Sequence, residues 1–159
     1  MAQIEFLGHL VSAGGITPKP DKLDVIANLK APKTLRELRG LLGTLGFYQT
    51  YIPNFATLAR PISKLMSTKT NFHWDAEQEA ALARIKAAFA NIDTLSMIDP
   101  ENTQEFILVT DASGTAIGAQ LLRIDGEGRQ LVVTNVSRAL TLTESRYSNT
   151  ERELLSYGH

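Results

Sequence analysis

The stretch FILVTDASGTAIGAQLL, residues 106–122, decides how the C-terminal half of this sequence is interpreted. An apolar run of β-forming residues ends at Asp111, and a second run built of small residues follows at once. In one interpretation Asp111 caps a turn between two strands, because Asp and Gly are common turn residues. In the other interpretation, the first strand carries the carboxylate to a functional site. The rest of the sequence has to decide between these two interpretations of Asp111.

The residues after 105 follow a period of two, which is typical of strands. A final helix is expected to begin near Ser148, because Ser148 and Glu151 have the spacing of a capping box. Three strands followed by a helix predict the beginning of an α/β or α+β layer. The strands are predicted over Phe106–Thr110, Ala116–Leu122 and Leu131–Val136, with DGEGR at 125–129 as a hairpin turn.

The N-terminal part predicts a hairpin and two helices. Residues 4–16, IEFLGHLVSAGGI, have two short apolar runs and a turn at Gly14–Gly15, and a helix is expected around residues 22–29. A second helix opens with Thr34 and Glu37 in capping-box spacing. Its glycines each cost about 1 kcal/mol relative to Ala, which indicates close approach of another backbone or a marginal helix. The glycines are Gly40, Gly43 and Gly46, and the predicted apolar face is Leu35, Leu38, Leu42 and Leu45.

Two more helices are predicted before the strands. The first follows a turn at Pro53–Asn54 and is expected to be interrupted or restarted at Pro61. The polar stretch STKTN, residues 67–71, is interpreted as the main boundary in the chain. After it, Asp75 and Gln78 open a helix whose stripe is predicted to be buried core: Leu82, Ile85 and Phe89.

The composition is that of an ordinary globular protein. The chain has 159 residues, with 16 Lys and Arg against 17 Asp and Glu, so any contact with a phosphate backbone must be local. There is no cysteine and the three histidines are scattered, which argues against a disulfide framework or a Cys-based zinc site. A local basic stretch is either a solvated helix face or a phosphate-contacting surface. It consists of Lys30, Lys33, Arg36 and Arg39.

The sequence carries no signal for secretion or membrane insertion. The N-terminus lacks the basic start and apolar core of a signal peptide. No apolar stretch approaches the roughly 18 residues of a membrane span. We therefore expect an intracellular protein that is not secreted and has no membrane partner.

A strand-borne acid becomes a candidate metal ligand when a second acid can meet it. Leu154 and Leu155 are expected to anchor the last helix on the sheet, which would let Glu153 lean toward Asp111 while Glu151 caps the helix. Carboxylate oxygens suit Mg²⁺, and two such metals about 3.5–4 Å apart support in-line attack of water on a phosphodiester. The spacing alone also fits a solvated helix terminus.

A second local pattern points to a different reaction class. Asp111, Ser113 and Thr115 partly match the Asp-x-Asp-x-Thr motif of haloacid dehalogenase-type phosphohydrolases. The second acid of that motif is missing, so the leaving group has no evident proton donor. The segment that follows also alternates as a strand, and this interpretation is therefore disfavoured.

Several separate motifs together resemble one known family. The resemblance is carried by five stretches, which occur in this order: FLGHLVSAGGITPKPDKLDVI, LRGLLGTLGFYQTYIPNFATLARPISKL, FHWDAEQEAALARIKAAF, FILVTDASGTAIGAQLL and SRALTLTESRYSNTERELL. The chain resembles the Pol polyprotein of gypsy-type LTR retrotransposons, from the end of the reverse transcriptase palm into the ribonuclease H domain. The resemblance covers nearly the whole chain.

The resemblance implies a domain order and a fold class. Residues 1–30 would be the end of the palm with its primer-grip hairpin, 31–68 thumb-like helices, and 69–159 a truncated ribonuclease H-like domain. The expected fold is α+β: a small helical thumb-like part, then an incomplete ribonuclease H-like α/β sheet of three antiparallel strands and a helix. The absence of the domain's remaining strands and helices would leave a raw sheet edge and uncovered apolar surface.

The resemblance also assigns roles to residues. Asp111 and Glu153 match two metal-binding, catalytic carboxylates of the ribonuclease H site. The nucleic-acid-binding residues would be the primer-grip residues Phe6, Leu7, Gly8 and His9, with Lys33, Arg36 and Arg39 on the thumb. In FYQTYI, Gln49 and Thr50 stand where the family often has a basic pair, which weakens backbone contact there.

The family's activities are RNA-directed DNA synthesis and hydrolysis of RNA in RNA–DNA hybrids. The polymerase metal site would lie before Met1 and two further ribonuclease H acids beyond His159. We therefore expect the chain alone to lack polymerase activity and efficient ribonuclease H activity, and to bind its cofactor, Mg²⁺ or Mn²⁺, weakly. The alternative function is a non-catalytic nucleic-acid-binding or protein-interaction module.

The resemblance also predicts partners and a location. The expected nucleic-acid partner is an RNA–DNA hybrid or a template-primer duplex. The expected protein partner is the rest of the Pol polyprotein or a second chain. The location would be the cytoplasm, a virus-like particle or the nucleus.

Overall fold

The computed structural model describes residues 3–67, 72–101 and 104–158. Within these ranges the chain forms two three-stranded antiparallel sheets and five α-helices, which confirms the expected mixed α+β class. The N-terminal elements are β1 Gln3–Phe6, β2 His9–Ser12, β3 Gly15–Pro18, α1 Pro20–Ala27, α2 Leu35–Phe47 and α3 Phe55–Ser63. The C-terminal elements are α4 Ala76–Ala90, β4 Phe106–Ala112, β5 Ala116–Ile124, β6 Gln130–Ala139 and α5 Asn149–Tyr157. Short 3-10 helices are η1 Gln49–Tyr51, η2 Lys64–Met66 and η3 Glu144–Arg146.

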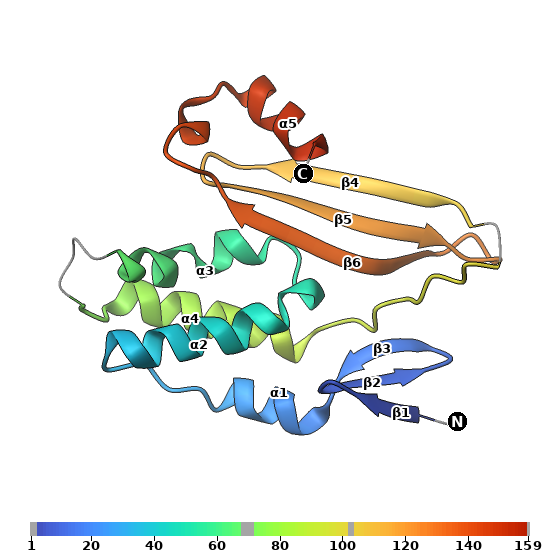
Figure 1. Ribbon diagram of the computed structural model, residues 1–159, viewed down its shortest axis with the longest axis horizontal. Coiled ribbons are helices and arrows are strands. Elements are labelled where there is room, and N and C mark those ends of the chain that lie inside the picture. The colour runs from blue at the N-terminus through green and yellow to red at the C-terminus, as the bar shows by residue number, and fades with distance from the viewer. Residues whose placement is uncertain (1–2, 68–71, 102–103, 159) are drawn as a thin grey trace.

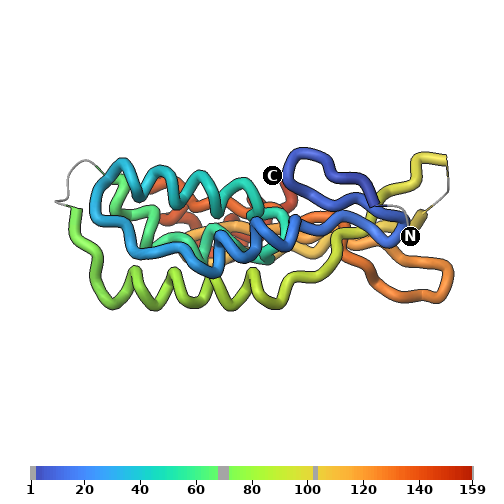
Figure 2. Tube along the Cα trace, turned by 90° about the horizontal axis from the view of Figure 1, so that it is seen from below, coloured from blue at the N-terminus to red at the C-terminus, as the bar shows by residue number. Residues whose placement is uncertain are grey.

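The larger sheet lies between α5 and the other helices in Figure 1. Its strand order is β4-β5-β6, with α5 against β4 and α3 against β6. Figure 2 shows the molecule as elongated, with helices gathered at one end and the small N-terminal sheet toward the other. Among the described residues, no helix has the length and apolar character needed to cross a bilayer.

The N-terminal segment is a three-stranded meander, although the sequence predicted only a hairpin. Leu7 and Gly8 both have positive φ, 48° and 83°, and form the two-residue turn between β1 and β2. Leu7 belongs to the first of the two apolar runs, but it lies in the turn and is 71% exposed. Gly15, with φ 130°, begins β3, which bridges to Leu95 through Ile16. The small sheet is therefore tied to the segment that precedes the larger one.

Helix α2 begins at the predicted cap but differs from the prediction in two details. Thr34 Oγ1 accepts a hydrogen bond from the Glu37 backbone N–H, as expected, whereas the Glu37 carboxylate accepts from the N–H of Lys33. Leu38, Leu41 and Leu45 are the buried leucines, while Leu35 and Leu42 are only half-buried. Leu41 therefore replaces Leu42 at the centre of the apolar face.

The glycines of α2 do not mediate close helix packing. Gly40 and Gly43 are exposed, and among the described residues nothing lies within 4 Å of a Cβ placed on Gly40, Gly43 or Gly46. The expected close approach of another protein backbone is therefore wrong. Gly40 and Gly43 leave the middle of one side of the helix without side chains.

The main core joins all four helices before the larger sheet. One buried cluster combines residues of α4 with Ile26, Leu38, Leu45 and Ile62. The predicted α4 stripe is confirmed, because Leu82, Ile85 and Phe89 are all buried. The core thus continues across the boundary predicted at residues 67–71, and placing a domain boundary there stays a prediction.

Pro61 does not interrupt α3. The helix runs through it to Ser63, and the Pro61 carbonyl accepts a hydrogen bond from Gln78 Nε2 at 3.1 Å. Gln78 also completes the predicted capping box of α4 with Asp75. One buried side chain therefore caps α4 and joins it to α3.

Candidate functional site

Asp111 lies near the end of β4, at the edge of the larger sheet. In the strand register it pairs with Gly118 on β5, and Gly118 pairs with Ser137 on β6. The carboxylate is exposed, and its Oδ2 accepts a hydrogen bond of 3.1 Å from Asn54 Nδ2. Because Asn54 precedes α3, the helical part of the chain supplies a direct polar partner to the candidate metal ligand.

The turn after β4 is capped by Ser113. Its Oγ accepts hydrogen bonds from the backbone N–H groups of Thr115 and Ala116, at 3.2 and 3.0 Å. Ser113 thus performs the turn-capping role that one interpretation gave to Asp111. Because Ser113 and Thr115 hold the turn, and β5 rather than a helix follows, the geometry also argues against the dehalogenase-type pattern.

Helix α5 carries the other candidate acid. Glu151 accepts a 2.7 Å hydrogen bond from the Ser148 N–H, which completes the capping box predicted for this helix. That backbone hydrogen bond is the main reason that the pKa of Glu151 is lowered. Glu153 is exposed on α5, a helix that packs against β4 and β5. Leu154 was expected to anchor the helix, but it is 66% exposed; Ser156 is buried and Leu155 half-buried.

The chemistry of these two acids fits a hard divalent cation, because carboxylate oxygens are preferred ligands of Mg²⁺ and Mn²⁺. Across residues 3–67, 72–101 and 104–158, however, no three His, Cys, Asp or Glu side chains converge on one point. That Asp111 and Glu153 share one metal therefore stays a prediction.

The residues predicted to form the primer grip lie at the tip of the β1–β2 hairpin, where Gly8 and His9 are half-buried. Phe6 and Leu7 are 62% and 71% exposed. His9 lies over the end of α2: its ring stacks on Phe47 at 5.4 Å between ring centroids, and its Nδ1 lies 2.8 Å from the Tyr51 hydroxyl. The hairpin tip and α2 thereby form one continuous surface.

One face of α2 is open to solvent along its length. Arg36, Gly40, Gly43 and Phe47 follow a spacing of four, three and four residues, which places them on one side of a helix. All four are exposed, and the buried leucines lie on the opposite side. Arg39, and Lys33 just before the helix, are exposed beside this face. The open face of α2 therefore presents basic side chains and bare backbone next to the exposed ring of Phe47.

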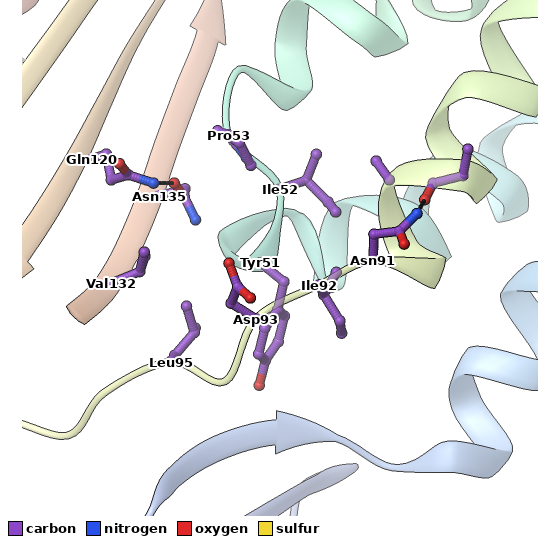
Figure 3. A pocket seen from close by; sticks show the side chains of 12 residues that line it. Tyr51, Ile52, Pro53, Asn91, Ile92, Asp93, Leu95, Gln120, Val132 and Asn135 are labelled. Carbon is purple, nitrogen blue, oxygen red and sulfur yellow. Dashed lines mark hydrogen bonds between the residues drawn. The ribbon is translucent and has the colours of Figure 1, made fainter. Parts of the chain in front are cut away.

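A cavity of about 290 Å³ lies between the helices and the larger sheet. Figure 3 shows Asp93 and Tyr51 on one side and the hydrogen-bonded pair Gln120 and Asn135 on the other. Asn135 is buried and also donates to the Thr50 carbonyl at 2.8 Å. These bonds join the larger sheet to η1, so the cavity belongs to the junction between helices and sheet.

A family model described as the RNase H-like domain found in reverse transcriptase matches residues 74–158. The chain belongs to this family. Two Pol polyproteins of Drosophila melanogaster transposons resemble nearly the whole chain, which confirms the resemblance to gypsy-type elements. The one from transposon 412 is 36% identical over 97% of this chain and 12% of its own length. The one from transposon gypsy is 34% identical over 96% of this chain and 15% of its own length.

Solved reverse transcriptases share the fold of this RNase H-like family member. A foamy viral protease-reverse transcriptase in complex with dsDNA has a TM-score of 0.84 at 26% identity, covering 99% of this chain and 33% of that one. The same kind of protein in complex with an RNA/DNA hybrid has a TM-score of 0.84 at 26% identity, over 98% and 21% of the two chains. The chain therefore spans a small part of the relatives it matches.

Sequence reasoning missed three residues around these sites. Asn54 was interpreted only as part of a turn, and Phe47 and Tyr51 were given no role. Asn54 has a left-handed backbone, with φ 54° and ψ 32°. Asn after Pro at a helix start is a local signal for that conformation, but the contact with Asp111 has no signal in the sequence.

Proposed function

We propose that this chain is the segment of a retrotransposon Pol polyprotein that holds an RNA–DNA hybrid or template-primer duplex and carries part of the ribonuclease H site. The observation that carries the proposal is the continuous surface from the hairpin tip to the open face of α2. His9 and Phe47 join the two parts by ring stacking. The complexes of the foamy viral enzymes with dsDNA and with an RNA/DNA hybrid support it.

The surface has the chemistry of backbone recognition. Arg36 and Arg39 can neutralise phosphates, and the exposed Gly40 and Gly43 let a sugar-phosphate backbone approach the helix closely. Phe6 and Phe47 offer exposed rings for stacking or sugar contact. Because the net charge is −1, affinity must come from these local groups.

The proposed cofactor is Mg²⁺, with Mn²⁺ as a substitute, held by Asp111 and Glu153. A bound divalent metal would activate water and stabilise charge at a phosphodiester. The chain's own contribution is to place Asp111 at the sheet edge and Glu153 on a capped helix packed against the same strand. Two carboxylates fix a hard cation only loosely, so we propose weak metal binding and little turnover by the chain alone.

Hybrid binding is tested by titrating the chain with a fluorescent RNA–DNA hybrid at two salt concentrations. Phosphate contacts predict affinity that falls steeply with salt, with a log–log slope of about −0.9 per phosphate neutralised. Affinity that does not change with salt would contradict the proposed surface.

Catalysis is tested separately, by cleavage of the RNA strand of the hybrid under Mg²⁺ and then Mn²⁺. We expect little cleavage, and no primer extension in a parallel assay. Robust cleavage that Asp111→Asn abolishes would show that the missing ligands come from elsewhere, most simply a second chain. Cleavage unaffected by Asp111→Asn would indicate a contaminating nuclease.

A further inference from the structure

One row of residues crosses the larger sheet where the helical part meets it. Asp111, Gly118 and Ser137 are register partners on β4, β5 and β6. Register partners on neighbouring strands point to the same face of a sheet. The row therefore presents a carboxylate and a hydroxyl on either side of a position that has no side chain.

The beginning of α3 lies on this row. The Ala56 N–H donates to Ser137 Oγ at 2.9 Å, and Asn54 Nδ2 donates to Asp111 Oδ2 at 3.1 Å. The Asn54 side chain covers Gly118, because a Cβ at Gly118 would overlap Asn54 Oδ1 and lie 3.5 Å from its Cγ. The missing side chain of Gly118 is thus the space that the Asn54 carboxamide fills.

The backbone of Asn54 explains why asparagine suits this position. It precedes α3 with φ 54° and ψ 32°, a left-handed conformation that asparagine adopts more readily than most residues. This conformation and the close packing on Gly118 restrict where the carboxamide can point. The bond to Asp111 spans 57 residues of sequence, so it is a tertiary contact.

We propose that Asn54 is a positioning residue for Asp111. This inference rests on the proposed function, in which Asp111 is a metal ligand. By holding Oδ2, the Asn54 amide fixes the rotamer of the carboxylate, and Oδ1 remains for a cation. Hydrogen bonds of this kind orient metal-binding carboxylates in proteins, and their loss typically costs about 10- to 100-fold in metal affinity. The contact also couples the position of α3 to the metal ligand.

The test is Mn²⁺ titration of the full chain, followed by paramagnetic broadening of backbone amide signals in NMR spectra. Asn54→Gly removes the amide but keeps a residue that tolerates positive φ. Gly118→Ala displaces the carboxamide without changing Asn54 or Asp111. We expect both variants to need about tenfold more Mn²⁺ to broaden the amides around residue 111.

Two controls separate positioning from stability. Ser137→Ala removes the neighbouring anchor of α3 on the same row and leaves the Asn54 amide in place. It should lower the melting temperature without changing the Mn²⁺ midpoint. Asp111→Asn should abolish the broadening at this site.

Unchanged midpoints in Asn54→Gly and Gly118→Ala, with broadening that still depends on Asp111, would overturn the positioning role and leave the metal assignment intact. An equal shift in Ser137→Ala would also overturn it, because general loosening would then explain the effect. Broadening that does not depend on Asp111 would overturn both the metal assignment and the positioning role.

Discussion

The Nδ1 atom of His9 lies 2.8 Å from the hydroxyl oxygen of Tyr51, and the two rings stack with their centroids 5.8 Å apart. His9 begins β2, and Tyr51 ends η1, which follows helix α2. Burial, followed by the effect of Tyr48, raises the pKa of Tyr51 to about 12, so its hydroxyl keeps its proton at neutral pH. The pair fixes the exposed hairpin tip against the helix that would contact nucleic acid.

Tyr51→Phe removes this hydrogen bond and keeps the ring. We expect a loss of about 0.5–1.5 kcal/mol in the free energy of unfolding, measured by urea denaturation. The matched control is Tyr157→Phe, where the tyrosine is 67% exposed. A change in Tyr157→Phe as large as that in Tyr51→Phe would contradict the role of the buried hydroxyl.

Gly15→Ala should destabilise the attachment of the small sheet. Gly15 has φ 130°, and an added Cβ would overlap the Leu95 carbonyl and lie 2.6 Å from Thr94 Cγ2. We expect a loss of about 2 kcal/mol or more, because backbone strain and overpacking add. At Gly14 the same Cβ would meet Ser12 Oγ at an ordinary 3.6 Å, so Gly14→Ala should unfold close to the parent in the same assay. Equal midpoints for the two variants would refute the prediction.

Leu45→Ala should damage the main core. Leu45 is fully buried in the cluster that joins α1, α2, α3 and α4. Removing a buried leucine costs about 2–5 kcal/mol, enough to lower the melting temperature by many degrees. Leu154→Ala, at the exposed leucine of α5, is the control and should stay within about 0.5 kcal/mol of the parent. A small effect at Leu45 would argue against the packing of α2 described above.

As the pH falls, the segment between β6 and α5 should lose protection from amide hydrogen exchange before the main core loses it. The Arg138 guanidinium and backbone N–H of Thr141 lower the pKa of Glu144 from 4.5 to about 2. A carboxylate with a lowered folded-state pKa stabilises the fold above its ordinary pKa, and this contribution is lost as pH falls from about 4.5 toward 2. Glu144→Gln should lose most of this pH dependence in amide hydrogen exchange of residues 138–147. Exchange with the same acid dependence in Glu144→Gln would show that another group is responsible.

Arg36→Ala should weaken binding of an RNA–DNA hybrid and reduce the magnitude of the salt slope by about 1, because one phosphate contact is lost. Arg84, exposed on α4, provides the matched control of equal charge. Fluorescence anisotropy at several salt concentrations measures both quantities. Equal losses from Arg36→Ala and Arg84→Ala would show that net charge matters and the α2 face does not.

Much of the local structure could be predicted from the sequence. Thr34, Asp75 and Ser148 cap the helices that they were expected to open. The three predicted strands are present, but they extend beyond the predicted ends to Ala112, Ile124 and Ala139. These features depend on residues a few positions apart, through capping bonds and side-chain periodicity. The sequence likewise indicated that Asp111 ends a strand, and the family resemblance selected it as a candidate ligand.

The tertiary structure alone decided which distant residues meet. Nothing in the local sequence distinguishes Leu41 from Leu42 as the buried leucine, because the choice depends on how α2 is rotated against its neighbours. The glycines of α2 cost the same free energy whether they face a protein backbone or solvent, so their open face became visible only in the packed molecule. Asn54 reaches Asp111 because α3 lies across the sheet over Gly118, a contact that follows from packing between elements far apart in the chain.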